Sequence, residues 1–145
     1  MREIRHTFQI KAAPEELLKA ITRGEEIAQW WTTSANLLPE EGAVGLFQWS
    51  NYHWTVEILL KKLRKDELVI WKCTSSNMQD TDAWEGSEME FRISKLGHRS
   101  VKLDFLHANY KESPCFDVCN DGWRFVLGNS LKSYLETGKG FPYKS

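Results

Sequence analysis

The 145-residue chain lacks the features that mark membrane, secreted and nucleic-acid-binding proteins. None of its apolar runs approaches the ~18 residues that a membrane-spanning helix needs, and the charged, alternating N-terminus MREIRHTFQI is unlike a signal peptide. The 19 Lys and Arg residues against 20 Asp and Glu give a net charge of −1, so no basic surface for nucleic acid or anionic lipid is expected. Only three cysteines are present, an odd number that argues against a disulfide framework and favours a cytoplasmic location.

Linkers, repeats and catalytic signatures are missing as well. The four prolines are scattered, and no low-complexity tract divides the chain, so a single domain over residues 1–145 is the simplest interpretation. No phosphate loop, dinucleotide-binding glycine pattern, HExxH or GxSxG motif occurs. We therefore expect no cofactor. Enzymatic activity stays open, with a non-catalytic role preferred.

Aromatic residues, in contrast, are plentiful. Seven Trp, seven Phe and four Tyr make up 12% of the chain. Each indole carries an N–H group that needs a partner when it is buried, and many such groups are hard to satisfy in a solid core. The composition leaves two alternatives, a heavily aromatic core or an aromatic-lined cavity.

Apolar periodicity at the N-terminal end predicts a strand followed by two short helices. Residues 3–11 alternate between apolar and polar side chains, as a half-buried strand does. Pro14 then opens a helix that Gly24 ends. A second short helix is expected to carry Trp30 and Trp31.

Beyond a loop over residues 32–42, the sequence period changes to two. The expected strands form an antiparallel meander with one apolar face, and they run approximately through 44–49, 54–60, 69–73, 88–93 and 100–107. After a loop that contains Pro114, the chain predicts one long helix with Asn120 or Asp121 at its N-cap and Gly138 at its end.

One long helix is too narrow to cover such a sheet. A helix is about 10 Å wide, whereas five or six strands at ~4.8 Å spacing are more than twice as wide. The sheet must therefore curl around the helix, and the short helices must close one end. This arrangement favours an apolar cavity between helix and sheet.

Five segments carry a family resemblance that spans nearly the whole chain: IxAxPEEL near the start, WWT at residues 30–32, DAWEGSEMEF, FLH ending at His107, and DGWRFVLGNSLKSYLETGKGFP. The chain resembles the family named after the activator of the Hsp90 ATPase, within the START-like (SRPBCC, birch-pollen-allergen-like) superfamily. The resemblance implies an α+β helix-grip fold. Its parts are a curved antiparallel sheet of about six strands, two short helices after the first strand, and a long C-terminal helix over a cavity.

The candidate ligand-binding residues lie on the expected inward faces and at the short-helix end. Each belongs either to the core or to a cavity wall that would stack on a ring or acyl chain. These candidates are Trp30, Trp31, Trp54, Trp71, Trp84, Phe91, Phe105, His107, Trp123, Leu127 and Leu131. His6 and His107 interrupt apolar faces, and each is either a hydrogen-bonded core histidine or a group that contacts ligand and moves protons.

Acidic residues and cysteines offer weaker candidates. Asp80, Asp82 and Glu85 surround Trp84, either as a solvated loop or as a group that closes a cavity mouth or holds a cation. Cys115 and Cys119 lack the paired spacing of a zinc site, so no metal is expected. They are ordinary free cysteines, or one is a thiol activated by a helix N-terminus.

Three functions follow from these alternatives. The first, which we favour, is binding of a small hydrophobic, aromatic or lipid-like molecule without covalent chemistry. The second is a polyketide cyclase-like enzyme with His107, or a cavity-facing Tyr or Asp, as general acid or base. The third is an interaction module that acts on an Hsp90-class ATPase in a stress response, or on another protein. Neither nucleic-acid binding nor membrane insertion is expected, and the sequence sets no oligomeric state.

Overall fold

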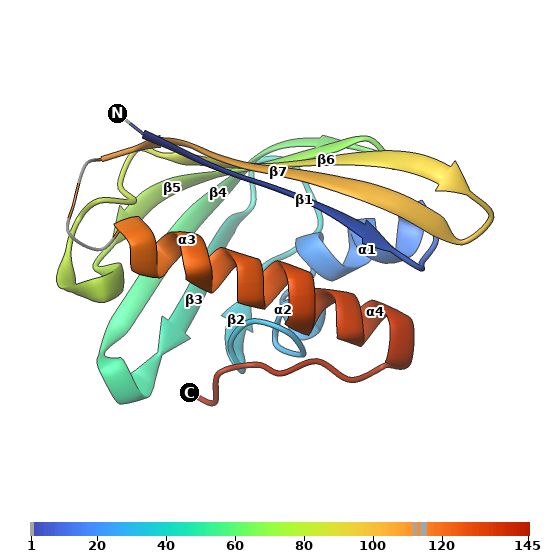
Figure 1. Ribbon diagram of the computed structural model, residues 1–145. Coiled ribbons are helices and arrows are strands. Elements are labelled where there is room, and N and C mark those ends of the chain that lie inside the picture. Colours follow the sequence, from blue (N-terminus) through green and yellow to red (C-terminus); the bar gives the residue numbers. More distant parts are fainter. Residues whose placement is uncertain (1, 112, 114–115) are drawn as a thin grey trace.

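Alternating apolar and polar residues build a curved antiparallel sheet that wraps around the C-terminal helix (Figure 1). A computed structural model describes residues 2–111, 113 and 116–145. Within these residues the sheet has seven strands in the order β1-β7-β6-β5-β4-β3-β2. The strands are β1 (Arg2–Ile10), β2 (Ser34–Asn36), β3 (Val44–Trp49), β4 (Trp54–Arg64), β5 (Leu68–Ser76), β6 (Glu88–Gly97) and β7 (Ser100–Tyr110).

The helices lie on the concave side of this sheet (Figure 1). Two short ones, α1 (Pro14–Thr22) and α2 (Gly24–Ile27), follow β1 as the sequence predicts. The C-terminal helix is continuous through α3 (Phe116–Phe125), a π-helical segment (Val126–Leu131) and α4 (Lys132–Thr137). It ends at Gly138, whose φ of 87° is the left-handed conformation that glycine adopts without strain. Among the described residues, no helix combines the length and apolar character needed to cross a bilayer.

The helix-grip architecture is confirmed, with differences at element boundaries. The sheet has a seventh strand because β2 forms inside the segment expected to be a loop, where three residues are too few to show a period. The C-terminal helix begins at Phe116, so the predicted N-cap at Asn120 or Asp121 is wrong. Trp30 and Trp31 lie in the turn after α2 rather than in it, because that helix ends at Ile27.

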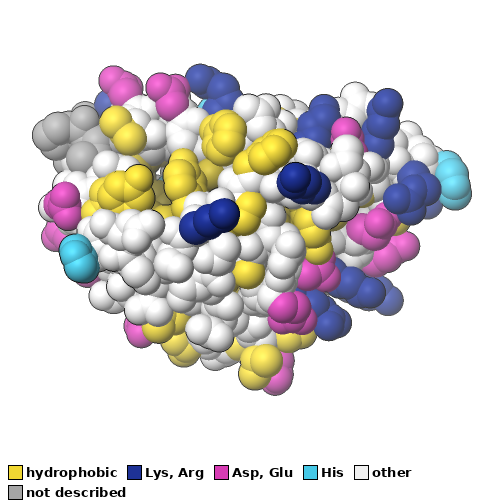
Figure 2. All heavy atoms as spheres, turned by 90° about the horizontal axis from the view of Figure 1, so that it is seen from below, with side chains coloured by type: hydrophobic (Ala, Val, Ile, Leu, Met, Phe, Trp, Pro, Cys, Tyr) yellow, Lys and Arg dark blue, Asp and Glu magenta, His cyan; other side chains and the backbone are white. Residues whose placement is uncertain are grey.

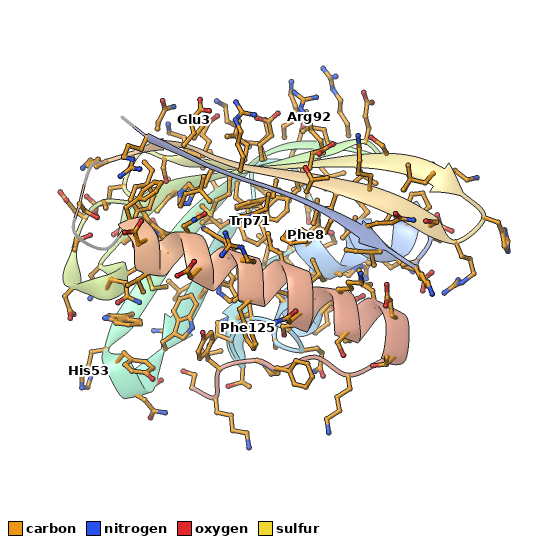
Figure 3. The ribbon with its side chains drawn as sticks, viewed as in Figure 1. Glu3, Phe8, His53, Trp71, Arg92 and Phe125 are labelled. Atoms are coloured by element: carbon orange, nitrogen blue, oxygen red, sulfur yellow. The ribbon has the colours of Figure 1, made fainter. Side chains whose placement is uncertain are left out.

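The space between sheet and long helix is filled by aromatic side chains, and two of the buried indoles donate to backbone carbonyls of α1. Figure 3 shows Trp71 pointing from the sheet towards the helix. Its Nε1 donates to the Ile21 carbonyl (3.1 Å), and Trp30 Nε1 donates to the Ala20 carbonyl (2.8 Å). Both carbonyls belong to the last turn of α1, where helical carbonyls have no partner within the helix. A solid core can therefore satisfy these indoles, contrary to the sequence-based argument.

The C-terminal tail, residues 138–145, runs back beneath the long helix (Figure 1). Tyr143 forms a parallel bridge with Thr32, in which the Tyr143 N–H donates to the Trp31 carbonyl (2.8 Å) and its carbonyl accepts from the Thr33 N–H (3.0 Å). Gly140 allows the close approach, because a Cβ there would overlap the Gln29 carbonyl oxygen and lie 3.1 Å from Trp30 Cα. The tail thus brings Tyr143 next to residues more than a hundred positions earlier.

Gly140→Ala should lower the free energy of unfolding by about 1–3 kcal/mol, because the added methyl group meets rigid backbone. Gly97→Ala is the matched control, since its Cβ would meet nothing within 4 Å. Urea denaturation of both variants measures the difference. Equal stabilities would show that the tail does not pack as described.

Candidate functional site

A pocket of about 220 Å³ opens at the N-terminal end of α3, between this helix, the loops that face it and the C-terminal tail. Its lining comes from segments far apart in the sequence, brought together by the curl of the sheet. The lining residues are Trp31, Trp49, Tyr52, Trp54, Met78, Gln79, Trp84, Val118, Cys119, Gly122, Trp123, Val126 and Tyr143.

Four tryptophans form the floor of the pocket: Trp31, Trp49, Trp84 and Trp123, each at most 4% exposed. They pack on one another, with ring centroids 5.5 Å apart in the stacked pair Trp84–Trp123 and 5.0 Å apart in the edge-on pair Trp31–Trp49. Such mutual packing holds the rings in fixed orientations. The floor is therefore a rigid apolar surface formed before any ligand arrives.

The rim of the pocket is more exposed and consists of Tyr52, Trp54, Val118 and Tyr143. Tyr52 stacks on Trp54 with ring centroids 4.6 Å apart, and the Trp54 Nε1 donates to the Asp80 carboxylate (3.1 Å). The backbone carries unusual conformations here, with positive φ at Gln79 (57°) and Asp80 (60°). Residues held in this region at some energetic cost often cluster at binding sites.

His107 lies directly behind the floor. Its Nδ1 accepts a hydrogen bond from Trp123 Nε1 (3.2 Å), so the ring proton must be on Nε2, which donates to Ser87 Oγ (2.7 Å). The Ser87 hydroxyl in turn donates to the Trp84 carbonyl. This chain of bonds positions two floor tryptophans, and it explains why a histidine occupies an otherwise apolar face of β7.

Burial lowers the pKa of His107 from 6.5 to about 3. The side chain is fully buried and both ring nitrogens are engaged, so it is neutral at physiological pH and does not reach the pocket. Among the alternatives for His107, the geometry corresponds to the hydrogen-bonded core residue. His6 is half-buried, and its Nε2 contacts the Asn120 carbonyl (3.2 Å), which joins β1 to α3.

The structure divides the candidate residues into two groups. Trp31, Trp54, Trp84 and Trp123 line the pocket. The others are buried in the core and are not part of its lining: Trp30, Trp71, Phe91, Phe105, His107, Leu127 and Leu131. A ligand-binding role for the first group stays a prediction.

Sequence patterns did not single out several lining residues. Trp49 alternates with its neighbours in β3 and could have been identified as inward-facing. Val118 precedes the expected N-cap of the long helix and Gly122 follows it directly. Tyr143 belongs to a tail without periodicity. Their place in the pocket depends on long-range packing, which leaves no local signal.

The acidic residues around Trp84 do not converge. Asp80 accepts from the Trp54 indole, Asp82 pairs with Lys111 (3.3 Å), and the Glu85 carboxylate accepts from the Ser76 N–H (3.2 Å). Across the described part of the chain, no group of three or more His, Cys, Asp or Glu side chains could hold a metal ion.

The cysteines have separate environments. Cys115 lies outside the described residues. Cys119 is buried in the first turns of α3 and borders the pocket. Burial raises the pKa of Cys73 to about 12, so this thiol stays protonated and unreactive.

Residues 11–136 match the family model described as "Activator of Hsp90 ATPase homolog 1-like protein". The chain belongs to this family. A solved Aha1 dimer from Colwellia psychrerythraea is 28% identical, with a TM-score of 0.82 over 97% of this chain and 100% of that chain. No curated protein matches the chain.

Two more distant structures share the fold. An Hsp90 activator from Plasmodium falciparum is 16% identical, with a TM-score of 0.66 over 88% of this chain and 97% of that one. DynU16, from the dynemicin biosynthetic locus, is 17% identical, with a TM-score of 0.75 over 95% of this chain and 48% of that one. At these identities the likeness establishes the architecture alone.

His107 should make stability depend on pH. Below pH 6.5 the unfolded chain protonates this side chain, whereas the folded protein resists protonation down to about pH 3. Stability is therefore fully present above pH 6.5 and falls as the pH drops, by at most about 1.4 kcal/mol per pH unit from this group. His107→Gln, which cannot titrate, should lose less stability between pH 7 and pH 5.

Urea denaturation at pH 7, 6 and 5 tests this expectation. The window stays above the range in which Glu16 contributes, whose pKa is lowered from 4.5 chiefly by the hydrogen bond from the Ala13 N–H. Parallel pH profiles for the two proteins would contradict the assignment of a neutral, buried imidazole.

Proposed function

We propose that residues 1–145 act as one domain that binds a small hydrophobic or aromatic molecule in the pocket at the N-terminal end of α3, without covalent chemistry. The observation that supports this most is the rigid floor of four tryptophans at the base of an opening to solvent. Concave apolar surfaces of this kind are where small molecules bind. A cytoplasmic location is part of the proposal, supported by the buried Cys73 and Cys119, neither of which forms a disulfide.

The size of the pocket limits the ligand. Sites for drug-sized molecules are about 300–1,000 Å³, whereas this pocket measures about 220 Å³. One ring or a compact branched group fits this volume. A longer lipid would place only one end in it, because the core under the rest of the helix is packed with side chains.

The lining favours binding over the cyclase-like alternative. The described residues that line the pocket include no His, Asp, Glu, Lys or Arg. Acid–base catalysis most often uses a histidine or a carboxylate within hydrogen-bond reach of the reacting atom, and the titratable side chains that do line the pocket are Tyr52, Tyr143 and Cys119. His107 is separated from the pocket by the floor and is neutral, with both ring nitrogens bonded.

Gly122 allows a sharp test. It lies within α3 on the pocket lining, and a Cβ there would meet nothing within 4 Å. Gly122→Leu should fill the pocket while the protein stays folded, since replacing a helix-interior glycine adds about 1 kcal/mol of helix propensity. Gly122→Ala is the matched control, with the same backbone effect and little loss of space.

Indole, p-cresol and 3,3-dimethylbutan-1-ol serve as probes, and NMR shifts of the tryptophan indole N–H signals report binding. We expect at least one probe to shift the floor and rim signals in the wild type and in Gly122→Ala, but not in Gly122→Leu. If none of the three binds the wild type, or if Gly122→Leu binds as well as Gly122→Ala, the pocket is not the binding site.

A protein-interaction role is the second candidate. Figure 2 shows hydrophobic side chains gathered on the face that carries the pocket. Phe125 and Phe141 are 40% and 51% exposed, and both line a shallow groove between the long helix and the tail. Exposed apolar patches often mark protein contacts. The family model and the Plasmodium neighbour, both described by Hsp90 activation, suggest an Hsp90-type ATPase as the partner.

The double variant Phe125→Ser/Phe141→Ser should abolish any stimulation of a purified Hsp90-type ATPase, with little change in stability because both rings are only about half buried. Leu38→Ser/Leu96→Ser is the matched control, since these leucines are 65% and 51% exposed and do not line the groove. ATP turnover with increasing amounts of each protein is the measurement. An equal effect of the two double variants, or no stimulation by the wild type, would exclude this role.

A further inference from the structure

We propose that the pocket selects a small organic cation of the trimethylammonium type over a neutral molecule of the same shape. The inference rests on the proposed function, because it names the ligand class for the same pocket. Three features of the lining support it: the density of aromatic rings, the direction of the indole N–H groups and the position of Asp80.

Aromatic rings form most of the pocket surface. Seven of the 13 lining residues are aromatic: Trp31, Trp49, Tyr52, Trp54, Trp84, Trp123 and Tyr143. Ring faces carry negative electrostatic potential, and clusters of such rings bind quaternary ammonium groups. A trimethylammonium group is compact and weakly hydrated, so it enters a 220 Å³ space at a smaller desolvation cost than an ordinary ammonium ion.

Three of the five indole N–H groups of the lining are bonded or buried and do not favour an anion. Trp123 Nε1 donates to His107 behind the floor, and Trp54 Nε1 donates to Asp80 at the rim. Trp84 Nε1 is buried from solvent and has no hydrogen-bond partner within the described residues. These three rings therefore offer carbon and π surface to a ligand instead of hydrogen-bond donors. A carboxylate or phosphate would lose its hydration without gaining charge-assisted bonds.

Asp80 strengthens the preference for a cation. Its carboxylate lies 3.1 Å from Trp54 Nε1, and a hydrogen bond to an anion increases the electron density of the indole ring. Tyr52 stacks on the same ring at 4.6 Å, so the polarised surface belongs to an aromatic pair at the rim.

The other charged groups near the opening are acidic or paired, apart from Lys144. Asp117 lies in the first turn of α3 and offsets the positive end of that helix. Asp121 is paired with Arg124 (3.0 Å). Lys144 follows Tyr143 in the tail. The Lys144 carbonyl accepts a hydrogen bond from the Asn51 side chain (3.3 Å), which ties this part of the tail to the 50–52 turn.

Choline and 3,3-dimethylbutan-1-ol test the proposal, because they have nearly the same shape and differ in charge. Each is titrated into the wild-type protein, with the indole N–H signals as readout. We expect choline to bind about tenfold more tightly than the alcohol. Equal affinities, or tighter binding of the alcohol, would overturn the cation preference while leaving the proposed hydrophobic site intact. If neither compound nor any other probe binds, both proposals fail.

Asp80→Asn removes the negative charge of the Asp80 side chain and so measures what this charge contributes to cation binding. Asparagine tolerates the positive φ of 60° at this position, and its amide oxygen can still accept from Trp54. The affinity for choline should fall about three- to tenfold. Asp82→Asn is the matched control, because it removes a charge that is paired with Lys111 and does not contact Trp54.

The outcomes of the two variants are distinct. A loss of choline affinity in Asp80→Asn, with Asp82→Asn like the wild type, supports the polarised Trp54 ring. Equal losses in both variants would assign the effect to general surface charge and overturn the role of Asp80. Binding of choline that is as tight in Asp80→Asn as in the wild type would overturn it too. Indole N–H spectra of both variants confirm that the fold is retained.

Discussion

The structure depends on the hydrogen bonds that three buried indole N–H groups make beneath a single long helix. Trp30 and Trp71 donate to carbonyls in the last turn of α1, and Trp123 donates to His107. These bonds join α1 to the sheet and the sheet to α3. Because a buried N–H without a partner costs about 1–3 kcal/mol, they fix the short helix, the sheet and the long helix relative to one another, and the packing of the remaining rings follows from that arrangement.

The packing fixed by these hydrogen bonds also determines where a pocket remains between the sheet and the long helix. Under most of the long helix the interior is a packed cluster of apolar side chains. The opening lies at the N-terminal end of α3, where the 78–80 loop, the 50–52 turn and the tail meet around the floor. A narrow helix on a wide sheet thus leaves a small pocket at one end of the fold, and aromatic side chains make up more than half of the residues that line it.

Local patterns in the sequence predict much of this fold, because each depends on nearby residues. The alternation in β1 and β7, Pro14 at the start of α1 and Gly138 at the end of α4 are such features. The prediction of a cavity along the helix rested on the narrow helix above a wide sheet and on the number of indole N–H groups. It did not anticipate that the carbonyls at the end of α1 would accept two of those groups. The contribution of Tyr143 to the pocket likewise depends on backbone contacts at Gly140, which no periodicity reveals.

Hydrogen exchange of the individual indole N–H groups, followed by NMR, tests the central claim most directly. The account predicts that the Trp30 and Trp71 indole protons exchange only on global unfolding, because they are buried and bonded to α1, whereas the half-buried Trp54 proton at the rim exchanges by local opening. If the Trp71 proton exchanged as fast as that of Trp54, the interior would not be held together by these bonds, and the arrangement of the floor would need another cause.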